Sequence, residues 1–448
     1  MGMPSLRAAI FAIAVVPLIG CRTVTIEEHP PVERTAPEQC PALRVDLVDG
    51  PNQSVHVFGM TAGADCTTYA VGEYFGAPRV GGVALPFHEG WSGWMARFDA
   101  RGAAELVASL HGPDDASGGE ADEVVADGGG NMWVVGRADG ALHVGDAFVL
   151  EGTGSYVVAF GPTGAVRWGA RLRGEAVHST LRDDGTLSIF VRSDVLLESR
   201  FGDDGSRVDN LLGRGELGVM SGATKGDTTV LSSCTASDFT VADTRVLHHD
   251  TTPDELGNPT CDLALLAFDS EGTLQWVDGF DETGFSAGDL ALAMDEDGTI
   301  GMTASFSGTI DFGGGPLVTD PVAGEMRQLV ARFDAGGTLL DSRSFGAADF
   351  VGVEGIASGP DGGFELAGTV YGGSVDLGGE PITSRDTLGS GFTANVERDG
   401  AMSRGESRPG LVGLFENARG APFIATRDRA ADGTSPGMRL ETEAAERE

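Results

Sequence analysis

The stretch Gln328-Leu-Val-Ala-Arg-Phe-Asp-Ala-Gly-Gly-Thr-Leu-Leu-Asp-Ser-Arg-Ser-Phe-Gly346 decides the fold. A short apolar run ends in Phe-Asp, a glycine turn follows, and a second run ends in Phe-Gly. Glycine turns between short apolar runs are typical of β-hairpins. The stretch therefore predicts two antiparallel strands joined by a tight turn.

The first of these two strands recurs along the chain. Its last residue is in turn Phe98, Phe160, Phe201, Phe268, Phe333 and, more weakly, Val396. The steps between these positions are 62, 41, 67, 65 and 63 residues, a spacing that indicates a repeat fold. We expect the short third unit to have lost its middle and the long fourth unit to hold an insertion.

A second motif runs in phase with the first: an acidic or glycine turn that leads into an alternating strand. Its copies lie at 63–72, 127–136, 183–189, 225–231, 295–302, 361–368 and 417–425. A third feature, 308–315 with its partner 373–379, is predicted to be an exposed connection. No segment shows a sustained helical period.

Four or five short strands in each repeat of about 60 residues predict an all-β fold, either a β-propeller or a stacked β-solenoid. The units resemble the β-propeller repeat family of exported bacterial proteins, and residues 288–346 and 120–174 match it best. The resemblance spans roughly 54–427 and implies a propeller. It implies little about activity.

The number of repeats points to seven blades, with six as the alternative. The turn-plus-strand motif occurs seven times, whereas the Phe anchors number six. The chain offers two strands of a last unit at 411–415 and 422–426, and 42–48 looks like a strand without its blade. Pairing of the two chain ends would close the ring and remove open sheet edges.

The N-terminus has the form of an export signal. Residues 1–7 carry one positive side chain, and the apolar run 8–19 is too short to span a membrane as a helix. Leu18-Ile19-Gly20-Cys21 resembles the lipobox of bacterial lipoproteins, which implies removal of residues 1–20 and lipidation of Cys21. Arg22 favours the outer membrane, on its periplasmic or cell-surface face, because inner-membrane retention in that family often uses Asp.

Two polar segments flank the predicted propeller, 40–427. Residues 21–39 hold several Pro and Glu without a hydrophobic period and predict a disordered tether. Residues 428–448 are equally polar and predict a flexible tail.

Apart from Cys21, the chain has four cysteines, Cys40, Cys66, Cys234 and Cys261. An even number in an exported chain predicts disulfides. Three pairings are possible, and 40–66 with 234–261 is favoured because each closes a local loop. The second bridge would pin an insertion that contains His248 and His249. The chain has no C-x-x-C spacing of the kind that would suggest a metal site with cysteine ligands.

Composition excludes one class of partner. The 67 Asp and Glu outnumber the 30 Lys and Arg, which gives a formal charge of −37. Nucleic acid would be repelled by that charge. The 69 glycines lack a collagen-like period and fit many tight turns.

Few residues suggest specific chemistry. The acidic turns 295–298, 183–185 and 203–205 could bind Ca²⁺, but hairpin turn chemistry explains the same residues. Trp168 and Trp276 lie where quinoprotein-type propellers have docking tryptophans, and we interpret them as strand packing because the other repeats lack one. Residues 90–94, Gly-Trp-Ser-Gly-Trp, leave two interpretations open: a tryptophan that stacks on a sugar, or one that lies in the core.

No catalytic motif, cofactor site or metal site is predicted. The sequence favours a lipid-anchored scaffold of the cell envelope that binds a protein or a glycan without catalysis. A carboxylate-dependent polysaccharide hydrolase or lyase, and an outer-membrane assembly factor of quinoprotein-like type, are the alternatives. Propeller folds serve many functions, so the fold does not choose among them.

Overall fold

The structure of the chain is a computed structural model. The structure describes residues 44–48, 53–63, 66–113, 118–145, 148–215, 217–235, 238–242, 245–247, 261–319, 326–346, 350–359, 362–378, 380–384, 389–408, 411–416, 422–427 and 438–442. The chain divides into two units, Met1–Gln39 and Cys40–Glu448. All described residues belong to the second unit.

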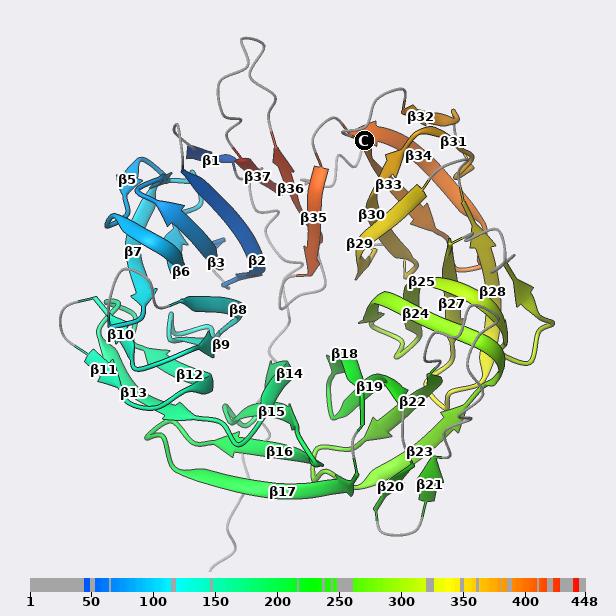
Figure 1. The fold of residues 1–448 in the computed structure, drawn as a ribbon, viewed down its shortest axis with the longest axis horizontal. Helices are drawn as coiled ribbons and strands as arrows, with labels where there is room; N and C mark the ends of the chain where they lie inside the picture. The colour runs from blue at the N-terminus through cyan, green and yellow to red at the C-terminus, as the bar shows by residue number, and fades with distance from the viewer. Residues whose placement is uncertain are drawn as a thin grey trace, which may run out of the picture. The chain divides into compact units, whose positions relative to one another are not determined.

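Every regular element in the described residues is a β-strand, and the strands form seven sheets of at least four strands (Figure 1). In each sheet four strands follow one another from the axis outward. The innermost strands are β2 (Ser54–Ala62), β8 (Gly119–Ala126), β14 (Glu175–Leu181), β18 (Val219–Lys225), β24 (Asp281–Met294), β29 (Phe350–Ser358) and β35 (Leu411–Glu416).

The outer strands follow in the same order around the ring. The second strands are β3 (Thr68–Gly76), β9 (Met132–Ala138), β15 (Leu187–Arg192), β19 (Thr228–Thr235), β25 (Ile300–Asp311), β30 (Phe364–Tyr371) and β36 (Pro422–Arg427). The third strands are β6 (His88–Phe98), β12 (Gly154–Phe160), β16 (Val195–Phe201), β22 (Asp262–Phe268), β27 (Arg327–Phe333), β33 (Ser390–Val396) and β37 (Met438–Thr442). The fourth strands are β7 (Ala104–His111), β13 (Val166–Arg171), β17 (Arg207–Arg214), β23 (Leu274–Gly279), β28 (Leu339–Phe345), β34 (Met402–Arg408) and β1 (Arg44–Val48).

The ring is closed. Neighbouring innermost strands contact one another from β2 through β8, β14, β18, β24, β29 and β35, and β35 contacts β2. Strand β1, from the start of the chain, pairs with β37, from its end, with Val45 opposite Leu440. The all-β propeller prediction and its closure by the terminal strands are therefore confirmed, and the β-solenoid alternative is wrong.

The predicted flexible tail, 428–448, is wrong in part because β37 lies within it and supplies the third strand of the closing sheet. Met438, Leu440 and Thr442 alternate with charged residues, which is a strand pattern. The pattern is only five residues long and is flanked by polar sequence. The polar composition of the segment 428–448 therefore gave no indication of this strand.

The repeat motifs lie where they hold each sheet together. The Phe anchors and Val396 end the third strands and are buried. Where the structure describes it, as at 127–131, 183–186 and 295–299, the second motif forms the turn into the second strand. In a typical turn the Asp295 carboxylate accepts hydrogen bonds from the amides of Asp297 and Thr299, and Gly298 has a φ of +81° that favours glycine.

The third unit keeps all four of its strands, and the part of its middle that is lost is the long connection between the second and third strands. Strands β15 and β16 are joined by a turn of two residues, Ser193 and Asp194, where other sheets have a long connection. These long connections carry small strands of their own: β4 (Arg79–Val80), β5 (Val83–Ala84), β10 (Leu142–Val144), β11 (Phe148–Leu150), β20 (Phe239–Val241), β21 (Arg245–Leu247), β26 (Leu317–Val318), β31 (Gly373–Val375) and β32 (Ile382–Ser384).

Several of these small strands extend the sheet that precedes their own. Strand β4 pairs with β1, β10 with β7, and β20 with β17, so each covers an outer edge that would otherwise be open. The predicted exposed connections, 308–315 and 373–379, are correct in part: Gly313–Gly315 are exposed, as are Ser374, Asp376 and Gly378, but each segment also carries a buried apolar residue. Phe312 is 6% exposed and Leu377 is 1% exposed, because both pack into apolar clusters to which two neighbouring sheets contribute.

Trp168 and Trp276 link neighbouring sheets, which corrects the strand-packing interpretation. The indole N–H of Trp168 donates to the Asp203 carbonyl at 3.1 Å, and that of Trp276 donates to the Ala335 carbonyl at 3.1 Å. Each acceptor lies in the turn after the third strand of the following sheet. Both rings pack over the glycine of that turn, Gly205 or Gly337. Two sheets thus have a tryptophan contact of the docking type.

Candidate functional site

The innermost strands carry β-bulges, at which the pairing skips one or two residues. The register of β2 shifts between Val57 and Gly59, and that of β8 shifts between Ala121 and Glu123. Corresponding shifts occur in β14, β18, β24, β29 and β35. Bulges are common next to functional sites, where they redirect a side chain. The residues left out of the pairing in β2 and β8 are Phe58 and Asp122, and both are exposed.

Phe58 belongs to a group of aromatic residues that we call the aromatic platform, namely His56, Phe58, Phe75 and Trp91. The rings of His56 and Trp91 are stacked with their centroids 5.0 Å apart. Phe75 lies 5.9 Å from Trp91, and Phe58 lies 6.3 Å from His56. Phe58 is 40% exposed and Trp91 is 41% exposed. Large aromatic side chains exposed together are unusual on a surface that contacts only water.

The predicted Gly90–Trp94 motif divides between surface and core. Trp91 belongs to the exposed platform, whereas Trp94 is fully buried and donates its indole N–H to the His56 carbonyl at 2.9 Å. The two tryptophans are an odd number of residues apart on one strand, so they face opposite sides of it. Trp94 therefore supports the platform from below, and Trp91 forms part of its surface.

Carboxylates border the platform, and we call Glu73, Glu120 and Asp122 the acidic group. Glu73 lies opposite His56 in the β2–β3 pairing, with its Oε1 2.9 Å from His56 Nδ1. Glu120 pairs with Arg137 at 3.2 Å. Asp122 keeps an exposed edge, but the protein around it desolvates its carboxyl and raises its pKa to about 6. The charges of Glu120 and Glu73 raise this pKa further, and Arg137 lowers it. The neighbourhood of Asp122 therefore carries an excess of negative charge.

Backbone packing places the acidic group next to the platform. Gly59 follows Phe58 in β2, and a Cβ atom on Gly59 would lie 2.8 Å from the Asp122 carbonyl oxygen. Similarly, a Cβ on Gly118, the residue before β8, would lie 3.6 Å from the Trp91 carbonyl oxygen. The inner strands of two consecutive sheets thus bring the two groups side by side.

A carboxyl–imidazole pair lies further around the ring. Nδ1 of His178, on β14, is 3.7 Å from Oε1 of Glu123, on β8. Burial raises the pKa of Glu123 to about 7, against hydrogen bonds from Ser179 that lower it. Burial and the charge of Arg182 lower the pKa of His178 to about 4. At neutral pH the imidazole is consequently neutral, and the carboxyl titrates much closer to neutrality than a solvated glutamate does, a property suited to proton exchange.

The imidazole of His178 is held from its other side. Its Nε2 is 3.0 Å from Oγ1 of Thr224, on β18, which is itself 3.0 Å from Oγ1 of Thr229. Three consecutive sheets therefore contribute to the environment of one histidine.

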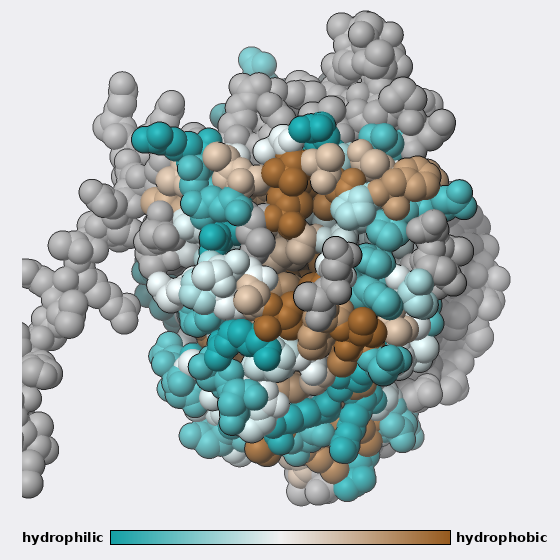
Figure 2. All heavy atoms as spheres, turned by 90° about the vertical axis from the view of Figure 1, so that its left-hand side faces the viewer, coloured by the Kyte–Doolittle hydropathy of each residue, from teal (hydrophilic) through white to brown (hydrophobic). Residues whose placement is uncertain are grey.

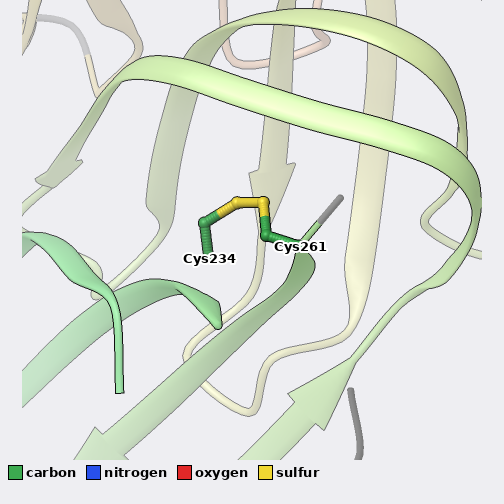
Figure 3. Close-up of a disulfide and its surroundings, with 2 residues drawn as sticks. All are labelled: Cys234 and Cys261. Carbon is green, nitrogen blue, oxygen red and sulfur yellow. A yellow bond between two sulfur atoms is a disulfide. The ribbon is translucent and has the colours of Figure 1, made fainter. Parts of the chain in front are cut away.

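The structure joins Cys234 to Cys261 across the connection between β19 and β22 (Figure 3). Their Cα atoms are 5.2 Å apart, within the usual range for a disulfide. Cys66 is also disulfide-bonded. Cys21, Cys40, His248 and His249 lie outside the described residues.

The acidic turns proposed for Ca²⁺ use their carboxylates for the turns themselves. Asp184 accepts the Thr186 amide at 2.8 Å, and Asp204 accepts the Ser206 amide at 2.9 Å. Within the described ranges, no group of three or more His, Cys, Asp or Glu is arranged to hold a metal ion. The same ranges contain no helix with the length and apolarity needed to span a bilayer.

The surface beside these sheets is mixed. Figure 2, viewed from the side on which β5 and β11 lie, shows small apolar patches among hydrophilic side chains. Exposed apolar residues of these strands and their connection are Val83, Phe87 and Val149. None of them has a ring contact with the aromatic platform among those the structure describes.

Sequence reasoning missed most of this site. It singled out the tryptophans of 90–94, but not His56, Phe58, Asp122, Glu123 or His178. No local motif marks these five residues, because a bulge and a contact between sheets depend on pairing register. Their only shared signal is a charged or aromatic residue within an inner-strand sequence.

No family model matches the chain, and no curated protein sequence matches it. Solved structures resemble its fold. Hydrazine synthase of Kuenenia stuttgartiensis has a TM-score of 0.51 at 10% identity and covers 89% of this chain and 97% of that chain. Virginiamycin B lyase of Staphylococcus aureus has a TM-score of 0.47 at 10% identity, over 89% and 99% of the two chains. The β-propeller domain of Cps50 from Myceliophteria thermophila has a TM-score of 0.45 at 10% identity, over 89% and 99%. At these identities the likeness concerns the fold alone.

Proposed function

We propose that this protein is a lipid-anchored β-propeller of the bacterial cell envelope that binds a protein or glycan partner through the aromatic platform. The observation that carries the proposal is the exposure of Phe58 and Trp91 on one sheet, beside polar groups able to orient a ligand. Aromatic side chains with a few placed polar groups are characteristic of binding sites.

The anchor is part of the same proposal. Cys21 would carry the lipid, and residues 21–39 would tether the propeller to the outer membrane. Several acyl chains hold a protein on a membrane where a single chain is marginal. We expect labelled palmitate to enter the wild-type protein and to be absent from Cys21→Ser, which should leave the membrane fraction. Equal labelling of both proteins would contradict the anchor.

The binding proposal is tested by affinity capture from detergent-solubilised membranes with the tethered protein intact. Trp91→Ala is the test variant. The matched control is Leu340→Ala on β28, where Leu340 is 50% exposed and lies on a different sheet. We expect a reproducible partner with the wild type and the control, and its loss with Trp91→Ala. No partner, or equal capture by all three proteins, would refute a role for the platform.

One observation favours a second function, a carboxylate-dependent polysaccharide hydrolase or lyase. Glu123, with a pKa near 7 beside His178, has the properties of a general acid or base. Purified protein would then cleave a polysaccharide, and Glu123→Gln would abolish cleavage while leaving capture of a partner unchanged. Absence of cleavage across a panel of envelope polysaccharides would argue against this alternative.

A further inference from the structure

We infer that the aromatic platform and the acidic group form one site for a cationic side chain, so that the partner is a protein segment that presents Lys or Arg. This inference rests on the proposed binding function and names the chemistry of its partner. It follows from the position of the two groups, their unbalanced charge and the properties of aromatic faces.

The two groups are continuous. The ring face of His56 stacks on Trp91, and its Nδ1 atom contacts the Glu73 carboxylate. One residue therefore joins the aromatic rings to a carboxylate. Phe58 directly precedes Gly59, whose backbone packs on Asp122. A ligand group at the platform is therefore within electrostatic reach of several carboxylates.

The charges of this region do not balance. Arg137 is occupied by Glu120 at 3.2 Å, and His56 is the partner of Glu73. Asp122 is exposed and has no salt bridge among the described residues. An incoming cation would replace the missing counter-charge, whereas an anionic ligand would be repelled by the carboxylates and by the total charge of −37.

Aromatic rings next to carboxylates recognise cations in two ways. The face of Trp or Phe attracts an ammonium or guanidinium group through the ring quadrupole, and the carboxylate supplies a charge-assisted hydrogen bond. A guanidinium can use both at once, because it stacks on a ring while its edge donates to an oxygen. A neutral glycan would use the rings but gain little from the charge of Asp122.

The probe for the test is a blocked tetra-arginine peptide, and binding to the full chain is followed by tryptophan fluorescence or calorimetry. We expect Trp91→Ala to weaken binding about 5-fold to 30-fold through loss of the ring face. Asp122→Asn should weaken it about 5-fold, and raising the salt from 50 to 300 mM should weaken wild-type binding most. Trp91→Phe keeps an aromatic face and should retain most of the affinity.

Matched controls separate this site from attraction by the acidic surface in general. Asp204→Asn removes an exposed carboxylate from a turn in another sheet, and Leu340→Ala removes an exposed apolar side chain. Both should bind within about 2-fold of the wild type, because neither residue touches the platform. Thermal melts of every variant show whether each remains folded.

The possible outcomes are distinct. Equal weakening by Trp91→Ala, Asp122→Asn and the controls would overturn the inference, since binding would then follow surface charge alone. If the peptide does not bind while membrane capture still depends on Trp91, the inference is wrong and the binding proposal stands. If capture also fails, the proposed function itself is wrong. Tighter binding of a neutral oligosaccharide than of the peptide would likewise overturn the inference that the site recognises a cationic side chain.

Discussion

Replacing Glu123 with glutamine is expected to stabilise the folded protein at pH 8 and to have much less effect at pH 5. The carboxyl has a pKa of 4.5 when solvated, and burial raises it to about 7 in the folded state. Above pH 7 the Glu123 carboxyl is ionised in both the folded and the unfolded state, and in the folded state the charge lies in a poorly solvated position. Below pH 4.5 the group is neutral in both states. The cost to stability therefore appears as the pH rises through this window.

The magnitude follows from the same two values. A rise from 4.5 to about 7 corresponds to roughly 3 kcal/mol against the ionised form. The side chain is 34% exposed, and solvent screening lowers the expected gain in the free energy of unfolding to about 1–2 kcal/mol. At pH 5 about a quarter of that gain should remain. Glutamine keeps the shape of the side chain and an oxygen that can accept a hydrogen bond from the backbone of Ser179.

Urea unfolding of the wild type and Glu123→Gln at pH 5 and pH 8, followed by tryptophan fluorescence, measures the difference. Asp184→Asn is a control in which the free energy of unfolding should change in the opposite direction, because hydrogen bonds from Thr186 lower the pKa of Asp184. That variant should be less stable than the wild type at pH 8. The reasoning would be refuted if Glu123→Gln were no more stable than the wild type at pH 8, or if its gain were the same at both pH values.

Three further changes test contacts that hold the fold. Trp276→Phe removes the hydrogen bond to the Ala335 carbonyl and should lower the free energy of unfolding by about 1–2 kcal/mol in urea titration; an unchanged midpoint would show that the contact between the sheets contributes little. Arg171 donates to four carbonyls of the connection that carries β10 and β11, and to the carbonyl of Gly154 at the start of β12. Arg171→Met should expose that connection to limited proteolysis and cost about 2–4 kcal/mol, whereas an unaltered cleavage pattern would contradict this role. The disulfide of Cys234 with Cys261 spans 27 residues, so the double serine variant should lose about 3–4 kcal/mol, and an equally stable variant would argue against the bridge.

The sequence by itself determined the repeat, the strand ends and the turns. Phe333 and its equivalents, and turns such as 295–298, fall where they were predicted, because an apolar strand end and a glycine with positive φ are local requirements. The closing strand β37 was not predicted, because a strand of five residues is stabilised by its partners on both sides and has little sequence pattern of its own.

The tertiary structure alone decided where the candidate site lies. Trp91 stood out in the sequence, but Phe58, Asp122, Glu123 and His178 come from three strands that no local pattern connects. Their positions depend on bulges in the pairing and on contacts between neighbouring sheets. A shift of one residue in register would turn each side chain to the opposite face, so chain order cannot specify which of them meet.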